Sequence, residues 1–261
     1  MSPRSHVFLI RYTKRGSGKT GVKFGRVTLI LKRRGVAAAL LLSFLALNIA
    51  PLPARADDAA QFPIIADDGN VIANHTVPNE LVARIEKLQN IVGAGNPAGK
   101  VTLYEFYDLN CPYCRRASED IDELIQSNPN LRLVLVPFPV LGIPSILAAR
   151  VEYAVNRLAT PENAYKFHRA VYQGRGTVDD KRALAAAQAV GLESVELRQV
   201  ANDDKFATVM KEHLRVGDAL GIQATPGLVL GGVAIVGYPG KKALTEVINA
   251  VAKCGTVMCP N

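Results

Sequence analysis

The stretch Glu105-Phe106-Tyr107-Asp108-Leu109-Asn110-Cys111-Pro112-Tyr113-Cys114-Arg115-Arg116 places two cysteines where a buried strand should give way to a helix. Residues 101–107 are β-branched, aromatic or apolar apart from Glu105, which is typical of a buried strand. The helix predicted to open at the cysteines ends at Asn128-Pro129, and a second buried strand is expected over 131–136. The cysteine pair therefore lies inside an α/β unit.

The position of Cys111 at a helix start suits thiol-disulfide chemistry. A thiolate attacks a disulfide, and the free N–H groups and dipole of a helix's first turn stabilise that charge. Cys114 lies one turn further on, where it can attack the mixed disulfide that Cys111 forms and release the substrate. An inert clip with this spacing would constrain the unfolded chain little. We therefore interpret the pair as redox active.

The other two cysteines, Cys254 and Cys259, follow the last predicted helix. An even cysteine count in an exported chain favours disulfides, so we interpret this pair as a structural clip of the C-terminus. A second redox relay is the alternative. A four-thiolate zinc site is disfavoured because 139 residues separate Cys114 from Cys254, and no metal site is predicted.

A block of helices separates the two halves of the α/β unit. Apolar periodicity and breakers predict helices over 144–158, 161–173, 178–190, 192–201 and 203–220. Two apolar runs, 227–230 and 233–236, flank Gly231-Gly232 and predict a hairpin, and a last helix is expected over 241–253.

The net charge of +8 comes from the beginning of the chain. Eleven of the 31 Lys and Arg residues precede Asp57, and no acidic residue does; the remainder has 20 basic against 23 acidic residues, a net of −3. A basic segment, an apolar run over 36–50 and Ala54-Arg55-Ala56 predict a secretory signal peptide over 1–56. The alternative is an uncleaved membrane anchor, against which Pro51 and Pro53 argue. The charge is thus no evidence for nucleic-acid binding.

Residues 57–99 are expected to form a short N-terminal arm with its own turn and helix signals. Apolar pairs on either side of Asp67-Asp68-Gly69-Asn70 predict a small hairpin or bend. Leu81, Ile85, Leu88 and Val92 recur at helical spacing, which predicts an amphipathic helix over 79–92. We expect this arm to pack on the domain that follows, with an oligomer contact as the alternative.

Residues 101–253 resemble the DsbA-like branch of the periplasmic thiol-disulfide oxidoreductases with a thioredoxin fold. The segment 105–116 is similar to the family's active-site segment, and Gly221-Ile222-Gln223-Ala224-Thr225-Pro226-Gly227 is similar to its second signature. The resemblance implies an α/β thioredoxin fold, with the following organisation: an arm over 57–99, a thioredoxin domain over 100–253 that contains a helical insertion at about 144–220, and a cysteine tail over 254–261.

The resemblance also implies roles for individual residues. Cys111, Cys114 and Glu105 would be catalytic, and Glu105 would be a buried acid that moves protons to and from the inner thiol. A surface position for Glu105 is the alternative. Thr225-Pro226 would be a cis peptide facing the cysteines, and contacts with substrate would come from Pro112, Tyr113, Thr225 and Pro226.

Other polar residues near these motifs have plainer interpretations. Arg115 and Arg116 are expected either to add positive potential beside the thiolate or to lie on a solvated helix face. The histidines at 75, 168 and 213 are read as isolated surface or packing residues.

The direction of reaction is less constrained by sequence. Tyr113 stands where the strongly oxidising family member has histidine, so one stabilising donor is lost and a less oxidising potential is expected. We rank disulfide formation first; the alternatives are a disulfide isomerase or reductase, and a non-catalytic binding module. The implied setting is the periplasm, with reduced or unfolded exported proteins as substrates, a membrane thiol-disulfide partner that resets the site, no cofactor and no nucleic acid. A homo-oligomer is left open.

Overall fold

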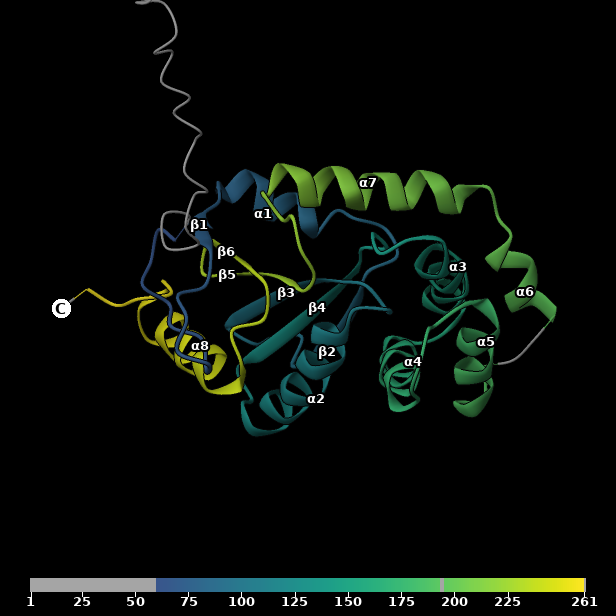
Figure 1. The fold of residues 1–261 in the computed structure, drawn as a ribbon, viewed down its shortest axis with the longest axis horizontal. Helices are drawn as coiled ribbons and strands as arrows, with labels where there is room; N and C mark the ends of the chain where they lie inside the picture. Colours follow the sequence, from purple (N-terminus) through teal and green to yellow (C-terminus); the bar gives the residue numbers. More distant parts are fainter. Residues whose placement is uncertain (1–59, 193–194, 261) are drawn as a thin grey trace, which may run out of the picture. The chain divides into compact units, whose positions relative to one another are not determined.

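A computed structural model of the chain describes residues 60–192 and 195–260 (Figure 1). The signal peptide predicted over 1–56 lies outside these residues. Within the two described ranges, no helix is both long enough and apolar enough to cross a lipid bilayer.

A six-stranded sheet contains one pair of parallel neighbours among its strands β1–β6 (Figure 1). They are β3 (Val101–Tyr107) and β4 (Leu131–Pro137), joined by α2 (Pro112–Ser127). The hairpin of β5 (Gly227–Leu230) and β6 (Val233–Val236) pairs antiparallel to β3. The strand order is β1-β6-β5-β3-β4-β2. The predicted α/β unit is confirmed, including the bounds of β3, β5 and β6.

Helices cover both faces of the sheet (Figure 1). On one face lie α1 (Asn79–Ile85) and α7 (Lys205–Ala219), and on the other α2 and α8 (Lys241–Cys254). Alternate residues of β3 serve the two cores, since Phe106 packs with the α1 and α7 residues and Tyr107 with those of α2 and α8. Because side chains alternate along a strand, Glu105 shares the face of Tyr107, beneath α2.

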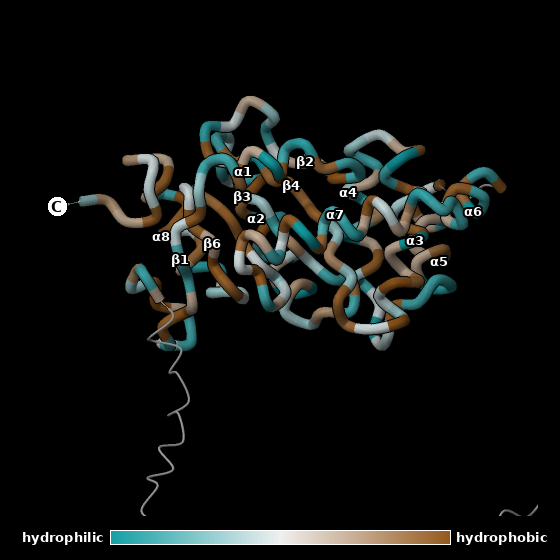
Figure 2. The backbone as a smooth tube through the Cα atoms, turned by 90° about the horizontal axis from the view of Figure 1, so that it is seen from above, coloured by the Kyte–Doolittle hydropathy of each residue, from teal (hydrophilic) through white to brown (hydrophobic). Residues whose placement is uncertain are grey.

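The predicted helical insertion is present between β4 and β5. Its helices are α3 (Ile143–Leu158), α4 (Pro161–Gln173), α5 (Asp180–Ala189), α6 (Val195–Ala201) and α7. α3 packs against α4, α5 and α6, whereas α7 returns to the sheet beside α1 (Figure 1). Hydrophobic stretches follow β3 and β4 through the interior (Figure 2).

The helix predicted over 79–92 is shorter than expected. α1 ends at Ile85, and Val92 begins strand β2 (Val92–Gly95), which pairs with β4. Between them, Asn90 has a positive φ of 65°, which a helix does not allow. Leu88 and Val92 are buried as their spacing suggested, but they face different cores. Apolar spacing alone therefore overextended the helix.

The N-terminal arm is built into the sheet at both edges. β1 (Asn74–Thr76) pairs with β6, and β2 pairs with β4. The expected bend is present, since Ile65 and Val71 form an antiparallel bridge around the turn. The arm thus packs on the following domain by completing its sheet, as predicted.

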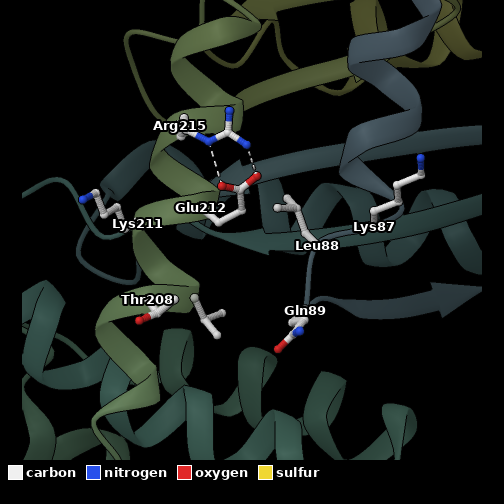
Figure 3. Close-up of a pocket in the computed structure, with 8 residues that line it drawn as sticks. Lys87, Leu88, Gln89, Thr208, Lys211, Glu212 and Arg215 are labelled. Carbon is white, nitrogen blue, oxygen red and sulfur yellow. Dashed lines mark hydrogen bonds and ion pairs between the residues drawn. The ribbon is translucent and has the colours of Figure 1, made fainter.

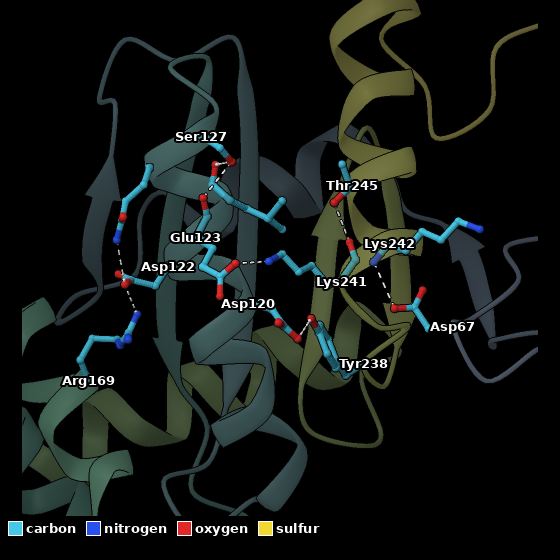
Figure 4. Close-up of polar contacts among 12 residues, drawn as sticks. Asp67, Asp120, Asp122, Glu123, Ser127, Arg169, Tyr238, Lys241, Lys242 and Thr245 are labelled. Atoms are coloured by element: carbon cyan, nitrogen blue, oxygen red, sulfur yellow. Dashed lines mark hydrogen bonds and ion pairs between the residues drawn. The ribbon is translucent and has the colours of Figure 1, made fainter.

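One residue of this bend caps a distant helix. The N-terminal cap of α8 is Gly240, which has no side chain to offer. Asp67 takes over that function, because its carboxylate accepts hydrogen bonds from Lys242 N at 3.1 Å and Ala243 N at 2.9 Å (Figure 4). A Cβ at Gly240 would lie 2.3 Å from Asp67 Oδ2.

Substitution of Gly240 by alanine should therefore lower the free energy of unfolding by more than the backbone strain at this position alone would. Gly142 caps α3 in a similar backbone region, with φ 110° against 96° at Gly240, but a Cβ there meets nothing closer than 4.0 Å. We expect Gly142→Ala to lose about 1–3 kcal/mol of unfolding free energy from strain. Gly240→Ala should lose roughly 1 kcal/mol more, because Asp67 is displaced from its capping position. Urea unfolding measures both, and equal losses would contradict the capping argument.

Candidate active site

Cys111 occupies the N-terminal cap of α2. Its backbone is extended, with φ −77° and ψ 121°, and Pro112 begins the helix. Proline suits that position because its fixed φ is helical and its missing N–H would have no partner there. The Cys111 sulfur accepts a hydrogen bond from Cys114 N at 3.3 Å. The helix start therefore points a backbone donor at this sulfur, as the sequence predicted.

Both cysteines of the pair are free thiols, so the structure represents the reduced form. Cys111 is 4% exposed and Cys114 is fully buried. The peptide bond between Thr225 and Pro226 is cis, as the resemblance implies. The Thr225 carbonyl lies 3.1 Å from Cys111 Sγ and accepts the S–H of this thiol when it is protonated. The two signature segments, 114 residues apart in sequence, thus meet at the outer sulfur.

The two sulfurs have opposite acidities. The pKa of Cys111 is lowered to about 6, chiefly by a hydrogen bond from the Cys114 thiol and further by the side chain of Thr225 and the backbone N–H groups of residues 113 and 114, against the effect of burial. The pKa of Cys114 is raised, because it is buried and donates to Cys111. At neutral pH, Cys111 is a thiolate and Cys114 keeps its proton.

Glu105 is buried on the face of β3 that lies beneath α2, with 1% of its surface exposed. Burial, and secondarily the negative charge of Cys111, raise its pKa to about 8. Among the described residues, neither carboxylate oxygen has a hydrogen-bond partner. This position excludes the surface alternative for Glu105. A carboxyl group that is protonated near neutral pH can give or take a proton during sulfur exchange.

A buried polar network fixes the loop before Cys111. The Asp108 carboxylate accepts hydrogen bonds from Ser145 Oγ at 2.7 Å, Asn110 N at 2.8 Å and the backbone N–H groups of residues 140 and 141 at 2.8 and 2.9 Å. The Asn110 amide bonds both N and O of Val178. These contacts tie the cysteine loop to the helical insertion.

Arg115 makes a contact that neither sequence interpretation foresaw. Its guanidinium donates to the carbonyls of Tyr172 and Gly174 and lies 5.5 Å from the centre of the Tyr172 ring. Arg115 therefore holds the end of α4 against α2. Arg116 is exposed, which agrees with a solvated helix face.

Sequence reasoning missed a buried polar cluster behind the site. Tyr107 OH donates to Glu152 Oε1 at 2.6 Å, and His168 Nδ1 lies 4.0 Å from the same oxygen. The His168 and Tyr107 rings are 4.5 Å apart. His168 is thus a packing residue, but it is not isolated. The members are scattered over β3, α3 and α4, so no local spacing could reveal them.

Cys254 and Cys259 form a disulfide just after α8, with their Cα atoms 5.8 Å apart. They are therefore not joined with the other pair in a four-thiolate site. No cluster of three or more His, Cys, Asp or Glu residues suited to a metal ion occurs within 60–192 and 195–260.

The cavities of the molecule differ in their relation to the thiols. One of about 460 Å³ lies between the α1–β2 connection and α7, where Arg215 pairs with Glu212 (Figure 3). Its lining contains none of the residues that surround Cys111. A second, of about 340 Å³, is lined by Tyr113 and Thr225 and so adjoins the redox site.

Comparison with known proteins supports the interpretation of the chain as a thioredoxin-fold protein. A family model described as Thioredoxin matches residues 86–250. The structure is similar to a thioredoxin-like oxidoreductase from Silicibacter pomeroyi DSS-3 (29% identity, TM-score 0.60, 65% of this chain and 96% of that one). It is also similar to a periplasmic thioredoxin-like protein from Salmonella enterica serovar Typhimurium (26%, 0.59, 67% and 97%). The thiol-disulfide exchange protein alpha-DsbA2 from Wolbachia pipientis (23%, 0.58, 66% and 96%) shares the fold. The predicted thioredoxin fold is confirmed.

A curated relative adds little about function. The Na(+)/H(+) antiporter NhaA 1 of Salinispora arenicola is 24% identical over 161 residues, which make up 61% of this chain. The chain spans 24% of the length of that protein.

The acidity of Cys111 can be titrated directly. In the reduced protein, thiolate absorbance at 240 nm should rise with a midpoint near pH 6, and Cys111→Ser should abolish that step. Cys114→Ala should move the midpoint upward because the principal donor is lost, whereas Cys114→Ser, which keeps a hydroxyl donor, should move it less. An unchanged midpoint in Cys114→Ala would contradict the assigned cause.

Glu105 should make the stability of the reduced protein depend on pH. Its folded pKa of about 8 lies above its ordinary value of 4.5, so its favourable contribution is complete below pH 4.5 and is lost as the pH rises through 8. Relative to Glu105→Gln, the wild type should therefore lose unfolding free energy between pH 4.5 and 8. Urea unfolding at pH 4, 6 and 8 measures the difference, and a difference that stays constant would refute the assignment.

Proposed function

Because the chain belongs to the thioredoxin family, we propose that it exchanges disulfides with exported proteins through Cys111 and Cys114, with disulfide formation as the net result. The observation that carries this proposal is the opposed acidity of the two sulfurs. One is a thiolate at neutral pH beside an open cavity, and the other is a buried, protonated thiol. An inert clip needs no such difference.

The reaction follows from this asymmetry. In the oxidised protein, a substrate thiolate attacks Cys111 Sγ, the bond between Cys111 and Cys114 breaks, and Cys114 leaves and takes up a proton. Glu105, protonated near neutral pH, is the buried group that supplies that proton. A second substrate thiolate then attacks the substrate sulfur of the mixed disulfide and releases Cys111 as a thiolate. The substrate dithiol is oxidised to a disulfide, and the protein disulfide is reduced.

The stabilised Cys111 thiolate supports the direction of this reaction. A lower thiolate pKa favours the reduced protein and hence its action as an oxidant of substrates. The value of about 6 lies between those of about 7 for thioredoxin and about 3.5 for DsbA. We therefore expect a reduction potential between their values of about −270 and −120 mV. Thr225 before the cis proline keeps isomerase or reductase activity as the second candidate.

The proposed setting is the periplasm. The predicted signal peptide over 1–56 and the C-terminal disulfide both fit an oxidising compartment. A protein that oxidises substrates must be oxidised again, so we propose a membrane thiol-disulfide partner that accepts electrons from Cys111 and Cys114. Reduced exported proteins are the proposed substrates.

The function can be tested by oxidative refolding of reduced ribonuclease and by insulin reduction. We expect wild-type activity to be lost in Cys111→Ser and retained in a Cys254→Ser/Cys259→Ser variant, whose disulfide lies outside the site. Equilibration with glutathione buffers gives the potential. Activity in Cys111→Ser equal to that of an active wild type would contradict the catalytic role of Cys111, and a wild type without activity would favour a binding module. A potential below about −250 mV would exclude a primary oxidant and favour the reductase.

A further inference from the structure

We propose that the bend of the N-terminal arm, residues 66–72, forms one wall of the substrate groove and selects cysteine segments that carry an apolar neighbour and a basic residue. We call these residues the arm turn. The inference rests on the proposed function, which it deepens by naming the class of substrate segment.

The cavity beside the thiols is shared between the arm turn and the redox loops. Its volume is about 340 Å³, and its lining includes Val71 and Ile72 of the arm turn together with Tyr113 and Thr225 of the redox loops. Thr225 is also the residue whose carbonyl meets Cys111 Sγ. A side chain held in this cavity therefore belongs to a substrate residue close to the cysteine that bonds Cys111.

The walls of the cavity are largely apolar and aromatic. Tyr113 is 63% exposed, so most of its ring is available for contact with a substrate. Tyr238, which also lines the cavity, is held in place because its hydroxyl donates to Asp120 Oδ2 at 2.8 Å (Figure 4). Together with Ile72 and Ala224, these rings offer a preformed site for an aliphatic or aromatic side chain.

A single formal charge borders this cavity, that of Asp68. Its carboxylate accepts Asn70 N at 3.0 Å, which lowers its pKa and keeps it ionised. A lysine or arginine of the substrate would find its counter-charge there. A neighbouring hollow of about 230 Å³ shares Asp68 and Tyr113 with this cavity. It is also lined by Arg116 and by Asp67, whose carboxylate is engaged in capping α8, so Asp68 and Arg116 should act in opposite directions on a basic substrate.

The arm turn is mounted rigidly enough to act as a wall. Asp67 N donates to Pro239 O at 2.8 Å, and the Asp67 carboxylate caps α8. Within the turn, Ala66 N donates to Asn70 O at 2.8 Å. Because this wall is already fixed before binding, the free energy of binding does not include an entropy cost for ordering the arm turn.

The test measures how fast the oxidised protein reacts with three reduced peptides that contain Leu-Cys-Lys, Gly-Cys-Lys or Leu-Cys-Glu, with dithiothreitol as the reference. Because the chain has no tryptophan, acid quenching and mass spectrometry should follow the reaction. We expect the glycine peptide to react about ten-fold or more slowly than the leucine peptide. The glutamate peptide should be about two- to five-fold slower than the lysine peptide at low salt, and this difference should shrink at high salt.

Variants assign these preferences to the arm turn. Asp68→Asn should remove the preference for lysine over glutamate, Arg116→Gln should increase it, and Glu80→Gln, a carboxylate on α1 at the opposite face, should leave it unchanged. Equal rates for all three peptides, beside a normal reaction with dithiothreitol, would overturn the inference alone. No reaction with dithiothreitol or any peptide would overturn the proposed function itself.

Discussion

The arrangement of this site depends on the need to stabilise a negative charge on Cys111 Sγ. The sulfur must be reachable by another protein, and among the described residues the groups that stabilise its charge are hydrogen-bond donors. The start of α2 meets both demands, because Cys111 is the cap residue and the backbone N–H and thiol of Cys114 point back at it. Arg115, the nearest cation in sequence, is committed to the carbonyls of Tyr172 and Gly174.

Buried polar groups behind the cysteines couple the sheet to the helical insertion. Asp108 is fully satisfied by donors from three segments, which makes it a fixed anchor for the cysteine loop. Glu105 has no such partners, and an unpaired buried carboxyl is costly unless it is protonated. One buried acid thus provides rigidity, while the other remains free to exchange a proton. The difference lies in their hydrogen bonds, since both are about 1% exposed.

The sequence predicted those helices and strands whose bounds are set by residues within or next to the element itself. The bounds of β3, β5, β6 and α4 follow from apolar runs and from breakers such as Pro161, and the cysteine pair at a helix start follows from the same signals. The pattern failed where burial continued through a change of structure, at Leu88 and Val92. It also could not show contacts between distant segments, such as those of Glu152 with Tyr107 or of Asp67 with α8.

The pairing of β1 with β6 has a consequence for how the molecule folds. Asn74 lies opposite Ile235, 161 residues later in the chain, so this edge of the sheet cannot close until nearly the whole polypeptide is available. Contacts of such long range slow folding, because the intervening loop must be closed first. In the meantime β6 presents an unpaired edge on which another chain could add a strand. The first described strand of the chain therefore depends for its partner on the last strand of the sheet to be synthesised.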